Sequence, residues 1–295
     1  MRIGVDLGGT KVEGILVNDQ LEILERIRKP TPNTEGYPAI LRTIIELIGE
    51  LDSRAGQPCH IGIGTPGALS QVTGRMKNSN TLVLNDQPLK EDLESALNRK
   101  IKMANDANCF VLSEAIDGAA KGKSVVFGII LGTGVGGGIV INQQVIEGLH
   151  GIGGEWGHNE LDPKGPMWFD GRPGCVESFL CGGALAREYV GHGAPEGSTS
   201  HNLVEDMRNG NGLAIKTFDE WIDRFGKALS VVLNILDPDV VVLGGGLSNI
   251  DEIYEKAPAA AAKYIFNDEI RTPIVKNVHG DSSGVRGAAL LWPNP

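Results

Sequence analysis

The fold of this chain is decided by the stretch Arg2-Ile3-Gly4-Val5-Asp6-Leu7-Gly8-Gly9-Thr10-Lys11-Val12-Glu13-Gly14-Ile15-Leu16-Val17. Two apolar runs rich in β-branched residues flank a Gly-Gly pair, which predicts a strand, a tight turn and a second strand. Because glycine has no Cβ and tolerates positive φ, backbone N–H groups in such a turn can approach an anion and point at it. Asp6 ends the first strand, where its carboxylate would repel a bare phosphate but would suit a divalent cation or its waters. The alternative is an ordinary hairpin with a charged residue beside its turn.

The same pattern returns in Val125-Val126-Phe127-Gly128-Ile129-Ile130-Leu131-Gly132-Thr133-Gly134-Val135-Gly136-Gly137-Gly138-Ile139-Val140-Ile141. An internal repeat of this kind predicts two similar lobes, each with a phosphate-binding hairpin. The glycines also match the dinucleotide-binding fingerprint, but that motif needs a helix directly after them, and Ile139-Val140-Ile141 is strand-like. We therefore exclude a nicotinamide or flavin enzyme. The first turn is not a P-loop, because its order is Gly9-Thr10-Lys11 and a strand follows it.

The composition is that of a soluble globular protein, with 41% hydrophobic and 22% charged residues. The 295 residues suffice for two domains, since about 100 to 200 residues per domain are usual. A formal charge of −10 disfavours nucleic acid and an anionic membrane as partners, because both would repel the chain. The four cysteines are too few and too scattered for a disulfide framework, and neither a secretory signal nor a membrane span is visible. We expect a cytoplasmic protein.

Apolar periodicity and turn residues divide the rest of the chain. Gly118 to Lys123 is the best boundary, so the predicted lobes are 1–120 with a C-terminal helix in 281–295, and 121–280. Between Ile139 and Cys175 glycine and proline are dense, and a long irregular segment in a compact domain is usually functional. The predicted strands are Leu21 to Arg28, Ile61 to Gly64, Ile101 to Ala104 and Val240 to Leu243, and the predicted helices are Tyr37 to Leu51, Leu89 to Leu97, Asp106 to Ala120, Val176 to Tyr189, Asn202 to Arg208, Ala214 to Leu236, one beginning near Asn249 and a capped one in Asp281 to Trp292.

Two further turns end strands. Gly244-Gly245-Gly246 follows a buried strand, and its use would be close approach of the backbone to a flat or anionic ligand. The alternative is a plain connection from strand to helix. Gly64-Thr65-Pro66-Gly67 stops another strand at its carboxyl end, where α/β proteins usually bind ligands.

Four polar side chains are candidates for chemistry. Asp106, where a short strand gives way to a helix, is either a helix N-cap or a base that accepts the proton of a substrate hydroxyl attacking a phosphate. Glu155, His158 and Glu177 are acceptors of the kind that the vicinal hydroxyls of a sugar need. An isolated loop carboxylate is normally just solvated, so their functional interpretation requires that they cluster with Asp106.

With these residues assembled, the chain resembles a sugar kinase of the ROK family, within the actin-like ATPase superfamily. The resemblance runs from Met1 to Trp292 and rests on the order of its motifs. The segments Asn78-Ser79-Asn80 and Gly280 to Trp292 are most similar to bacterial fructokinase or mannokinase sequences. The motifs are the Asp6 to Lys11 turn, Gly64-Thr65-Pro66-Gly67, Asn105-Asp106-Ala107-Asn108, Gly132-Thr133-Gly134, Gly154-Glu155-Trp156-Gly157-His158, Gly174-Cys175-Val176-Glu177 and Gly244-Gly245-Gly246.

The resemblance implies a two-lobed actin-like ATPase (ribonuclease H-like) α/β fold, with mixed sheets flanked by helices and a cleft between the lobes. It implies that the first two glycine turns hold the phosphates of ATP and that Gly244 to Gly246 lies against the nucleoside. Asp106 would be the general base for the C6 hydroxyl of a hexose, with Mg²⁺ bridging phosphate oxygens, and the chain would form a homodimer. The implied sugar ligands are Gly67, Asn80, Asn105, Glu155, His158 and Glu177, and the implied ATP ligands are Gly4, Asp6, Gly8, Gly9, Thr10, Lys11, Gly132, Thr133, Gly134, Gly136, Gly244, Gly245 and Gly246.

One departure from the family concerns a structural zinc. Many family members bind it with the histidine of the Gly-His pair and three cysteines of a loop ending in Cys-x-Cys-Gly-x-x-Gly-Cys-x-Glu. Here Trp168 and Asp170 stand in place of the first two cysteines. His158 and Cys175 with Asp170 would give only three ligands, against the preference of structural zinc for four. We therefore expect no zinc, and we expect Cys181 to be buried packing on the following helix.

The expected function is that of an ATP-dependent hexose kinase, with fructose as the expected sugar and N-acetylhexosamine, glucose and mannose as alternatives. Two non-enzyme alternatives are a catalytically inert sugar-binding module and a sugar-responsive repressor of the same family. Such repressors carry a DNA-binding helix-turn-helix ahead of the kinase-like lobes. In this sequence Ile3 already belongs to the first strand, and the acidic charge disfavours DNA.

Overall fold

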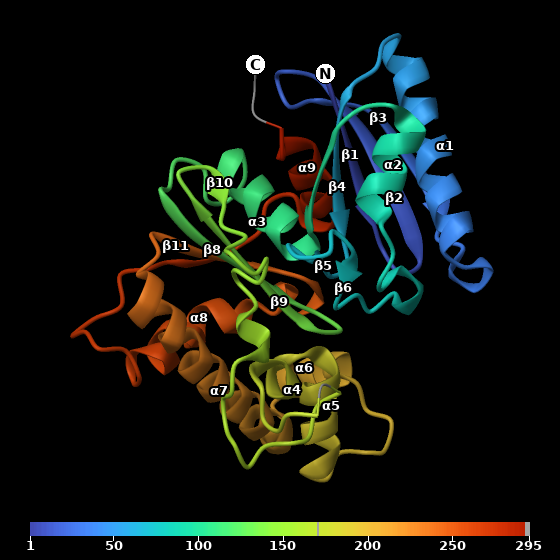
Figure 1. Cartoon of the computed structure of the whole chain (residues 1–295). Coiled ribbons are helices and arrows are strands. Elements are labelled where there is room, and N and C mark those ends of the chain that lie inside the picture. The colour runs from blue at the N-terminus through green and yellow to red at the C-terminus, as the bar shows by residue number, and fades with distance from the viewer. Residues whose placement is uncertain (170, 293–295) are drawn as a thin grey trace. The chain divides into compact units, whose positions relative to one another are not determined.

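The computed structural model describes residues 1–169 and 171–292 and divides into two compact units (Figure 1). The first unit comprises Met1–Lys121, Gln143–Gly153 and the chain from Asp281 onward, and the second comprises Gly122–Asn142 and Gly154–Gly280. The predicted second lobe, 121–280, runs straight through Gln143–Gly153, a segment that packs with the first unit. As functional domains, the predicted ranges stay predictions.

The first unit is built on a mixed sheet with the strand order β3-β2-β1-β4-β7. Strands β1 and β2 come from the opening stretch and pair antiparallel, with Leu7 opposite Val12. Strands β4 and β7 follow in parallel on the other side of β1. The elements of this unit are β1 (Arg2–Leu7), β2 (Lys11–Val17), β3 (Ile23–Pro30), β4 (His60–Thr65), β5 (Ala68–Leu69), β6 (Met76–Lys77), β7 (Ile101–Asn105), α1 (Tyr37–Ala55), α2 (Leu89–Leu97), α3 (Asp106–Ile116) and α9 (Ser283–Leu290).

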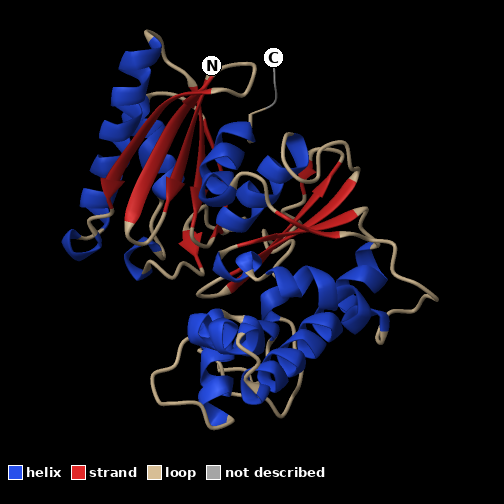
Figure 2. Cartoon of the chain, turned by 180° about the vertical axis from the view of Figure 1, so that it is seen from behind, coloured by secondary structure: helices blue, strands red, loops and turns tan. Residues whose placement is uncertain are grey.

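The alternation of side chains along β1 and β2 assigns helices to the two faces of this sheet (Figure 2). Gly14, opposite Val5, faces α1, because a Cβ placed on Gly14 would lie 2.2 Å from Leu47. Gly4 points to the opposite face, where a Cβ would lie 2.2 Å from the carbonyl oxygen of Val285 on α9. Glycine at position 4, predicted as an ATP contact, is thus required by the packing of a helix.

The second unit repeats this topology. Its sheet has the order β10-β9-β8-β11-β12, with β8 and β9 antiparallel and β11 and β12 parallel to β8. In each sheet, two strands follow in parallel beside the first strand of a glycine-turn hairpin, so the predicted internal repeat is present in the fold. The strand β10 (Gln144–Val145) at the edge of this sheet belongs to the segment Gln143–Gly153, which is part of the first unit. The elements of the second unit are β8 (Val125–Leu131), β9 (Val135–Ile141), β11 (Val240–Gly244), β12 (Ile274–Lys276), α4 (Val176–Leu180), α5 (Gly182–Gly191), α6 (Ser200–Arg208), α7 (Gly212–Leu236) and α8 (Asp251–Ala262).

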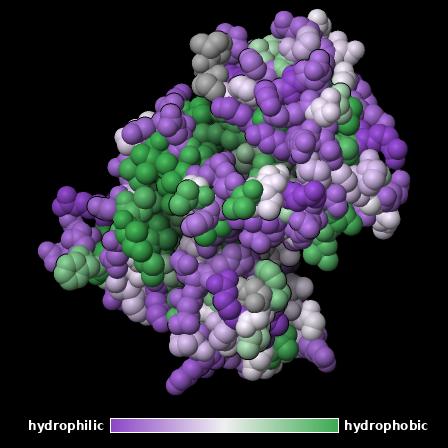
Figure 3. All heavy atoms as spheres, in the orientation of Figure 1, coloured by the Kyte–Doolittle hydropathy of each residue, from purple (hydrophilic) through white to green (hydrophobic). Residues whose placement is uncertain are grey.

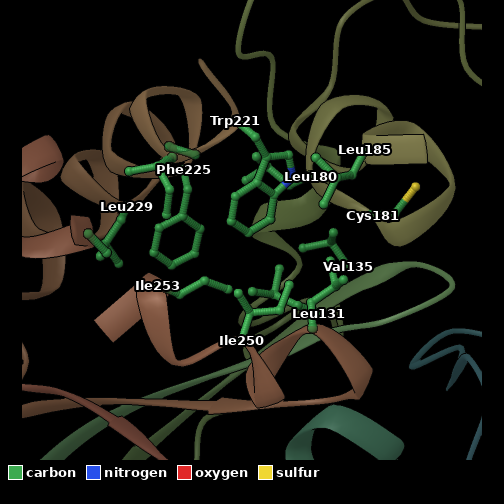
Figure 4. Close-up of a cluster of buried hydrophobic side chains, with 14 of the residues drawn as sticks. Leu131, Val135, Leu180, Cys181, Leu185, Trp221, Phe225, Leu229, Ile250 and Ile253 are labelled. Carbon is green, nitrogen blue, oxygen red and sulfur yellow. The ribbon is translucent and has the colours of Figure 1, made fainter. Parts of the chain in front are cut away.

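The core of the second unit lies between one face of its sheet and the surrounding helices. Phe127 and Ile129 of β8 are in register with Val241 and Leu243 of β11, so these four side chains share a face. Figure 4 shows the side chains that meet this face: Leu180, Leu185, Trp221, Phe225, Leu229, Ile250 and Ile253 gather around Leu131 and Val135.

Two predicted helices end differently in the structure. The helix predicted from Val176 to Tyr189 is broken at Cys181, which is extended with ψ 159°. Its Sγ accepts a hydrogen bond from the N–H of Ala184 at 3.4 Å, so Cys181 caps α5 rather than lying within a helix. Helix α3 ends at Ile116, not Ala120, because the carboxylate of Glu114 accepts the N–H of Ala119 at 2.9 Å.

The surface is mainly hydrophilic on the face shown in Figure 3, with an apolar area over the strands of the second sheet.

Helix α9 begins after Ser282, whose side chain makes no capping hydrogen bond, so the cap predicted for the last helix is absent. Within residues 1–169 and 171–292, no helix is long and apolar enough to cross a membrane.

Candidate active site

The first glycine turn, Gly8 to Lys11, is fixed through its carbonyl groups. Gly8 donates its N–H to the oxygen of Lys11 at 2.9 Å. The hydroxyl of Thr31 donates to the oxygen of Gly8 at 2.7 Å, and the amide of Asn33 donates to the oxygen of Gly9. The N–H groups of Gly9 and Thr10 have no partner among the described residues. The turn therefore offers free donors, as predicted for an anion site, although neither Gly8 nor Gly9 uses a positive φ.

Lys11 does not extend freely from this turn. Its Nζ lies 3.2 Å from an oxygen of Glu13, a buried carboxylate that also pairs with Arg26 and Arg28. Burial opposes ionisation of Glu13, but hydrogen bonds from Arg28 and Lys11 lower its pKa overall. Since Lys11 is 46% exposed, its side chain has room to turn from Glu13 to an anion. Its role toward ATP stays a prediction.

Asp6 is a half-buried carboxylate to which no described residue donates a hydrogen bond. It lies over two glycines, because a Cβ placed on Gly284 would be 3.4 Å from Oδ2 and one on Gly64 would be 3.8 Å from Oδ1. Burial, the charge of Asp106 and the charge of Glu13 raise the pKa of Asp6 to about 6. A carboxylate beside a second acid and without a protein donor is suited to a divalent cation or its waters.

Asp106 is the first residue of α3, and the N-cap is its neighbour. The side-chain oxygen of Asn105 accepts the N–H of Asn108 at 3.1 Å, so the interpretation of Asp106 as the N-cap is wrong by one residue. One oxygen of Asp106 accepts the N–H of Ala107 at 2.8 Å. Although the residue as a whole is exposed, desolvation of its carboxylate raises its pKa, against the effect of the Ala107 hydrogen bond. An accessible carboxylate with a free oxygen can act as a general base.

The other predicted sugar ligands of the first unit are Gly67 and Asn80, which lie on loops, and Asn105, which ends β7. Gly67 has φ +80°, and a Cβ there would lie 2.5 Å from the oxygen of Lys77, so the fold itself requires glycine. Asn80 is exposed and follows Ser79, whose backbone is held by Asn85 at 2.8 and 2.9 Å. Asn105 lines a cavity of about 330 Å³, together with Thr65, Ala68, Leu69, Ser70, Gln71, Gly74, Lys90, Met103, Ala104, Asn108, Glu147 and Gly151.

The second glycine turn, Gly132 to Gly134, is fixed by a carboxylate. Oε2 of Glu177 accepts the N–H of Val135 at 2.6 Å, and a Cβ on Gly134 would lie 2.5 Å from the same oxygen. Gly182 at the start of α5 donates its N–H to the oxygen of Gly132 at 2.8 Å. A Cβ on Gly132 would meet no atom within 4 Å. Glycine at 134 is thus explained by Glu177, whereas the protein gives no packing reason for glycine at 132.

Glu155 precedes the short 3-10 turn Trp156–His158 and His158 ends it, and His158 Nε2 lies 3.8 Å from Glu155 Oε2. The turn sits tightly on β9, since a Cβ on Gly137 would lie 2.6 Å from the ring of Trp156. Both side chains are about one-third exposed. They are close enough to contact one small ligand.

The third glycine turn borders a cavity of about 1000 Å³ in the second unit. Gly245 has φ +80°, and a Cβ there would lie 2.3 Å from the oxygen of Leu131, so the fold requires it. A Cβ on Gly246 would meet open space. Part of the cavity wall is one face of α6, a helix in which the sequence showed no motif. Besides Gly246, the lining residues are Gly132, Thr133, Gly182, Gly183, Ser200, His201, Val204, Glu205, Arg208, Asn209, Leu247, Asn249 and Ile250.

The structure thus gathers the predicted residues into two groups, one within each unit. Asp6, Asn105 and Asp106 lie together in the first, and the second and third glycine turns share one cavity in the second. Gly136 lies inside β9 opposite Ile130, and Gly244 ends β11, so both are strand residues rather than turn residues.

The residues present do not fit the zinc site of the family. Trp168 supplies no metal ligand, and Asp170 lies outside the described residues. In the described part of the chain, His158 and Cys175 belong to no group of three metal-ligating side chains. The one such group there consists of Glu188 of α5, His192 directly after α5, and Glu220 of α7. Two ligands fall short of the four that structural zinc prefers.

Comparisons with known proteins cover nearly the whole chain. A family model described as ROK family matches residues 2–294. The N-acetyl-D-glucosamine kinase of Haemophilus influenzae is 36% identical over 306 residues, which covers 99% of each chain. Among solved structures, the ROK hexokinase of Thermus thermophilus is 32% identical with a TM-score of 0.88, covering 98% of this chain and 97% of that one. The ROK glucokinase of Streptomyces griseus in complex with glucose and AMPPNP is 26% identical with a TM-score of 0.80, covering 100% and 99%.

These likenesses confirm the predicted fold class, an actin-like ATPase fold with mixed sheets flanked by helices. They also confirm the predicted class of enzyme, an ATP-dependent sugar phosphotransferase. The chain belongs to the ROK family.

Proposed function

We propose that this enzyme is an N-acetylhexosamine kinase that transfers the γ-phosphoryl group of ATP to the C6 hydroxyl of its sugar. The observation that supports the sugar is the 36% identity to an N-acetyl-D-glucosamine kinase over 99% of both chains. The sequence favours fructose, on the likeness of the segments Asn78 to Asn80 and Gly280 to Trp292. A match over the full length outweighs these two segments, and fructose, glucose and mannose become the alternatives.

We assign the proton transfer to Asp106. Its free carboxylate oxygen accepts the proton of the C6 hydroxyl while the hydroxyl oxygen forms a bond to the γ-phosphorus. The bond between that phosphorus and the bridging oxygen of ADP breaks, so hexose 6-phosphate and ADP are the products. The raised pKa of Asp106 brings it closer to the operating pH, which favours a general base.

The phosphates of ATP are assigned to the first two glycine turns. The free N–H groups of Gly9 and Thr10 and the open position at Gly132 support this assignment. Mg²⁺, when bound, would neutralise charge on the phosphate oxygens, and Asp6 would hold it or its waters because no described residue donates a hydrogen bond to Asp6. The nucleoside is assigned to the cavity beside Gly244, Gly245 and Gly246.

The sugar is assigned to Gly67, Asn80, Asn105, Glu155, His158 and Glu177. Glu177 already accepts two hydrogen bonds from the protein, one on each oxygen. Since an ionised carboxylate offers about four acceptor positions, a sugar hydroxyl can still donate to it.

We further propose a homodimer, which sedimentation or light scattering of the purified protein would test.

A panel of sugars tests this function. ADP release is measured with N-acetylglucosamine, N-acetylgalactosamine, N-acetylmannosamine, glucose, mannose and fructose, ranked by kcat/KM. We expect an N-acetylated hexosamine to rank first, and phosphate on C6 in the product by NMR. Fructose in first place would contradict the substrate, and release of ADP with none of the sugars would contradict the function.

A further inference from the structure

The loop from Asn159 to Gly174 in the second unit is closed by its own backbone. Leu161 donates its N–H to the oxygen of Gly174 at 2.8 Å, and Gly174 donates to the oxygen of Pro166 at 2.9 Å. Gly174 has φ +65°, and a Cβ there would lie 1.6 Å from the oxygen of Asp162. The two ends of the loop therefore meet too closely for any residue but glycine.

Trp168 ties this loop to the helices below it. Its indole N–H donates to Oε1 of Glu177 on α4 at 2.7 Å, and its ring centroid lies 5.7 Å from the guanidinium of Arg187 on α5. Its backbone N–H donates to the oxygen of Arg172 at 3.0 Å. The neighbouring Phe169 is in edge contact with His158, with ring centroids 6.2 Å apart. The loop thus touches both His158 and Glu177, two predicted sugar ligands.

Glu177 connects Trp168 to the backbone directly after the second glycine turn. The oxygen that does not bind Trp168 accepts the N–H of Val135 at 2.6 Å, directly after Gly134. Both hydrogen bonds end on one charged carboxylate, and such charge-assisted bonds are about twice as strong as neutral ones. Loss of the indole bond would free one oxygen of Glu177 and let the carboxylate rotate away from Val135.

We infer that Trp168 is a positioning residue that does for this loop what a metal does in other family members. Trp168 stands at the sequence position of the first missing cysteine, and its indole holds the loop on α4 through Glu177. Through Glu177 it also fixes the backbone of the second glycine turn, and this second part rests on the proposed binding of ATP phosphates there.

The test compares Trp168→Phe, which keeps an aromatic side chain but removes the indole N–H together with part of the ring system, with a control that loses the same atoms elsewhere. Trp292→Phe is that control, because its indole donates to the oxygen of Ile61 at 2.6 Å in the first unit. Removing a hydrogen bond to a charged group should lower kcat/KM for ATP about tenfold in Trp168→Phe, and Trp292→Phe should stay within about twofold of the wild type. In a Glu177→Gln background, Trp168→Phe should add less than about a further twofold. Effects that multiply instead would show that Trp168 does not act through Glu177.

Two readouts do not depend on activity. Amide hydrogen exchange at Val135 should speed up about tenfold in Trp168→Phe and stay unchanged in Trp292→Phe. The wild type should contain far less than one zinc per chain, and a chelator should not shift its Tm. Zinc at one per chain, or unchanged exchange at Val135, would overturn the inference. A wild type that phosphorylates no sugar would instead contradict the proposed function and leave these two readouts valid.

Discussion

The two glycine turns have the same place in two sheets of the same topology, but different side chains hold them. Side chains of Thr31 and Asn33 donate to the carbonyl groups of the first turn, and the N–H groups of Gly9 and Thr10 have no partner among the described residues. Directly after the second turn, the carboxylate of Glu177 accepts the N–H of Val135. A phosphate prefers donors, so the first turn is prepared for an anion, and the second turn has a negative charge at its shoulder.

The acids follow the same asymmetry. Asp106 lies close enough to Asp6 for its charge to raise the pKa of Asp6, and the pKa of Asp106 is raised as well. The carboxylate at the second turn is already satisfied by two protein donors. We infer that the first unit carries the chemistry, and that the second turn chiefly positions phosphate.

Asp106→Asn has the largest expected effect and tests this division. The amide cannot accept the proton of the sugar hydroxyl, so kcat should fall by about 10² to 10⁴, while sugar affinity measured by calorimetry changes little. Asp268→Asn, on an exposed loop, is the control and should keep normal turnover. A near-normal kcat for Asp106→Asn would show that Asp106 is not the catalytic base. It would also contradict the inference that the first unit carries the chemistry while the second glycine turn positions phosphate.

Gly134→Ala and Gly132→Ala form a pair that differs only in surroundings. A Cβ at 134 would lie 2.5 Å from the carboxylate of Glu177, so the turn or α4 must shift, at a cost of about 1 to 3 kcal/mol in the free energy of unfolding. A Cβ at 132 meets open space, so stability should stay within about 0.5 kcal/mol. The KM for ATP should nevertheless rise in Gly132→Ala if phosphate approaches that backbone. Thermal unfolding measures the stability of the two variants, and steady-state kinetics measures their KM for ATP. An unchanged KM in Gly132→Ala would contradict the binding of phosphate at the backbone of Gly132.

These two glycines also mark the limit of what sequence could predict. The hairpins, the repeat and the fold class follow from β-branched runs around glycine, which are local signals. Why each glycine is needed depends on what lies opposite it, such as Val285 for Gly4 or Glu177 for Gly134, and these contacts join residues far apart in the chain. The lining of the large cavity by Ser200 and His201 carried no signal beyond the polarity of one helix face.

The loop with Trp168 was half predicted. Comparison with the family motif marked Trp168 as a lost ligand, but the partner of its indole was not visible in the sequence. The break of the predicted helix at Cys181 has the same origin. Helical periodicity continues through it, whereas the turn at Gly132 takes the N–H of Gly182 and needs an extended residue there.

Asp6 gives the first unit a pH-dependent stability. Its pKa is raised from 3.8 to about 6 in the folded protein, so the folded state binds a proton between these values and the unfolded state does not. The stability that this provides is present below pH 3.8 and is lost as pH rises through about 6. Asp6→Asn should therefore be more stable than the wild type at pH 7, by about 1 to 3 kcal/mol, and nearly equal to it at pH 4. Melting curves across this range measure the difference, and a gap that does not change with pH would show that Asp6 does not titrate in this window.

Thr31→Val has the smallest expected effect and tests how the first turn is held. Valine keeps the shape of threonine and removes the donor to the oxygen of Gly8, which lies at 2.7 Å. The loss should cost about 1 kcal/mol and raise the KM for ATP about three- to fivefold, because the free N–H groups of Gly9 and Thr10 depend on the same turn. Thr43→Val is the matched control, since its hydroxyl donates to the oxygen of Ala39 at 2.9 Å within α1, far along the chain from either turn. It should lose similar stability with no change in KM. If both variants shift KM equally, the carbonyl contacts do not prepare the first turn for phosphate, and the contrast with the carboxylate-held second turn loses its functional meaning.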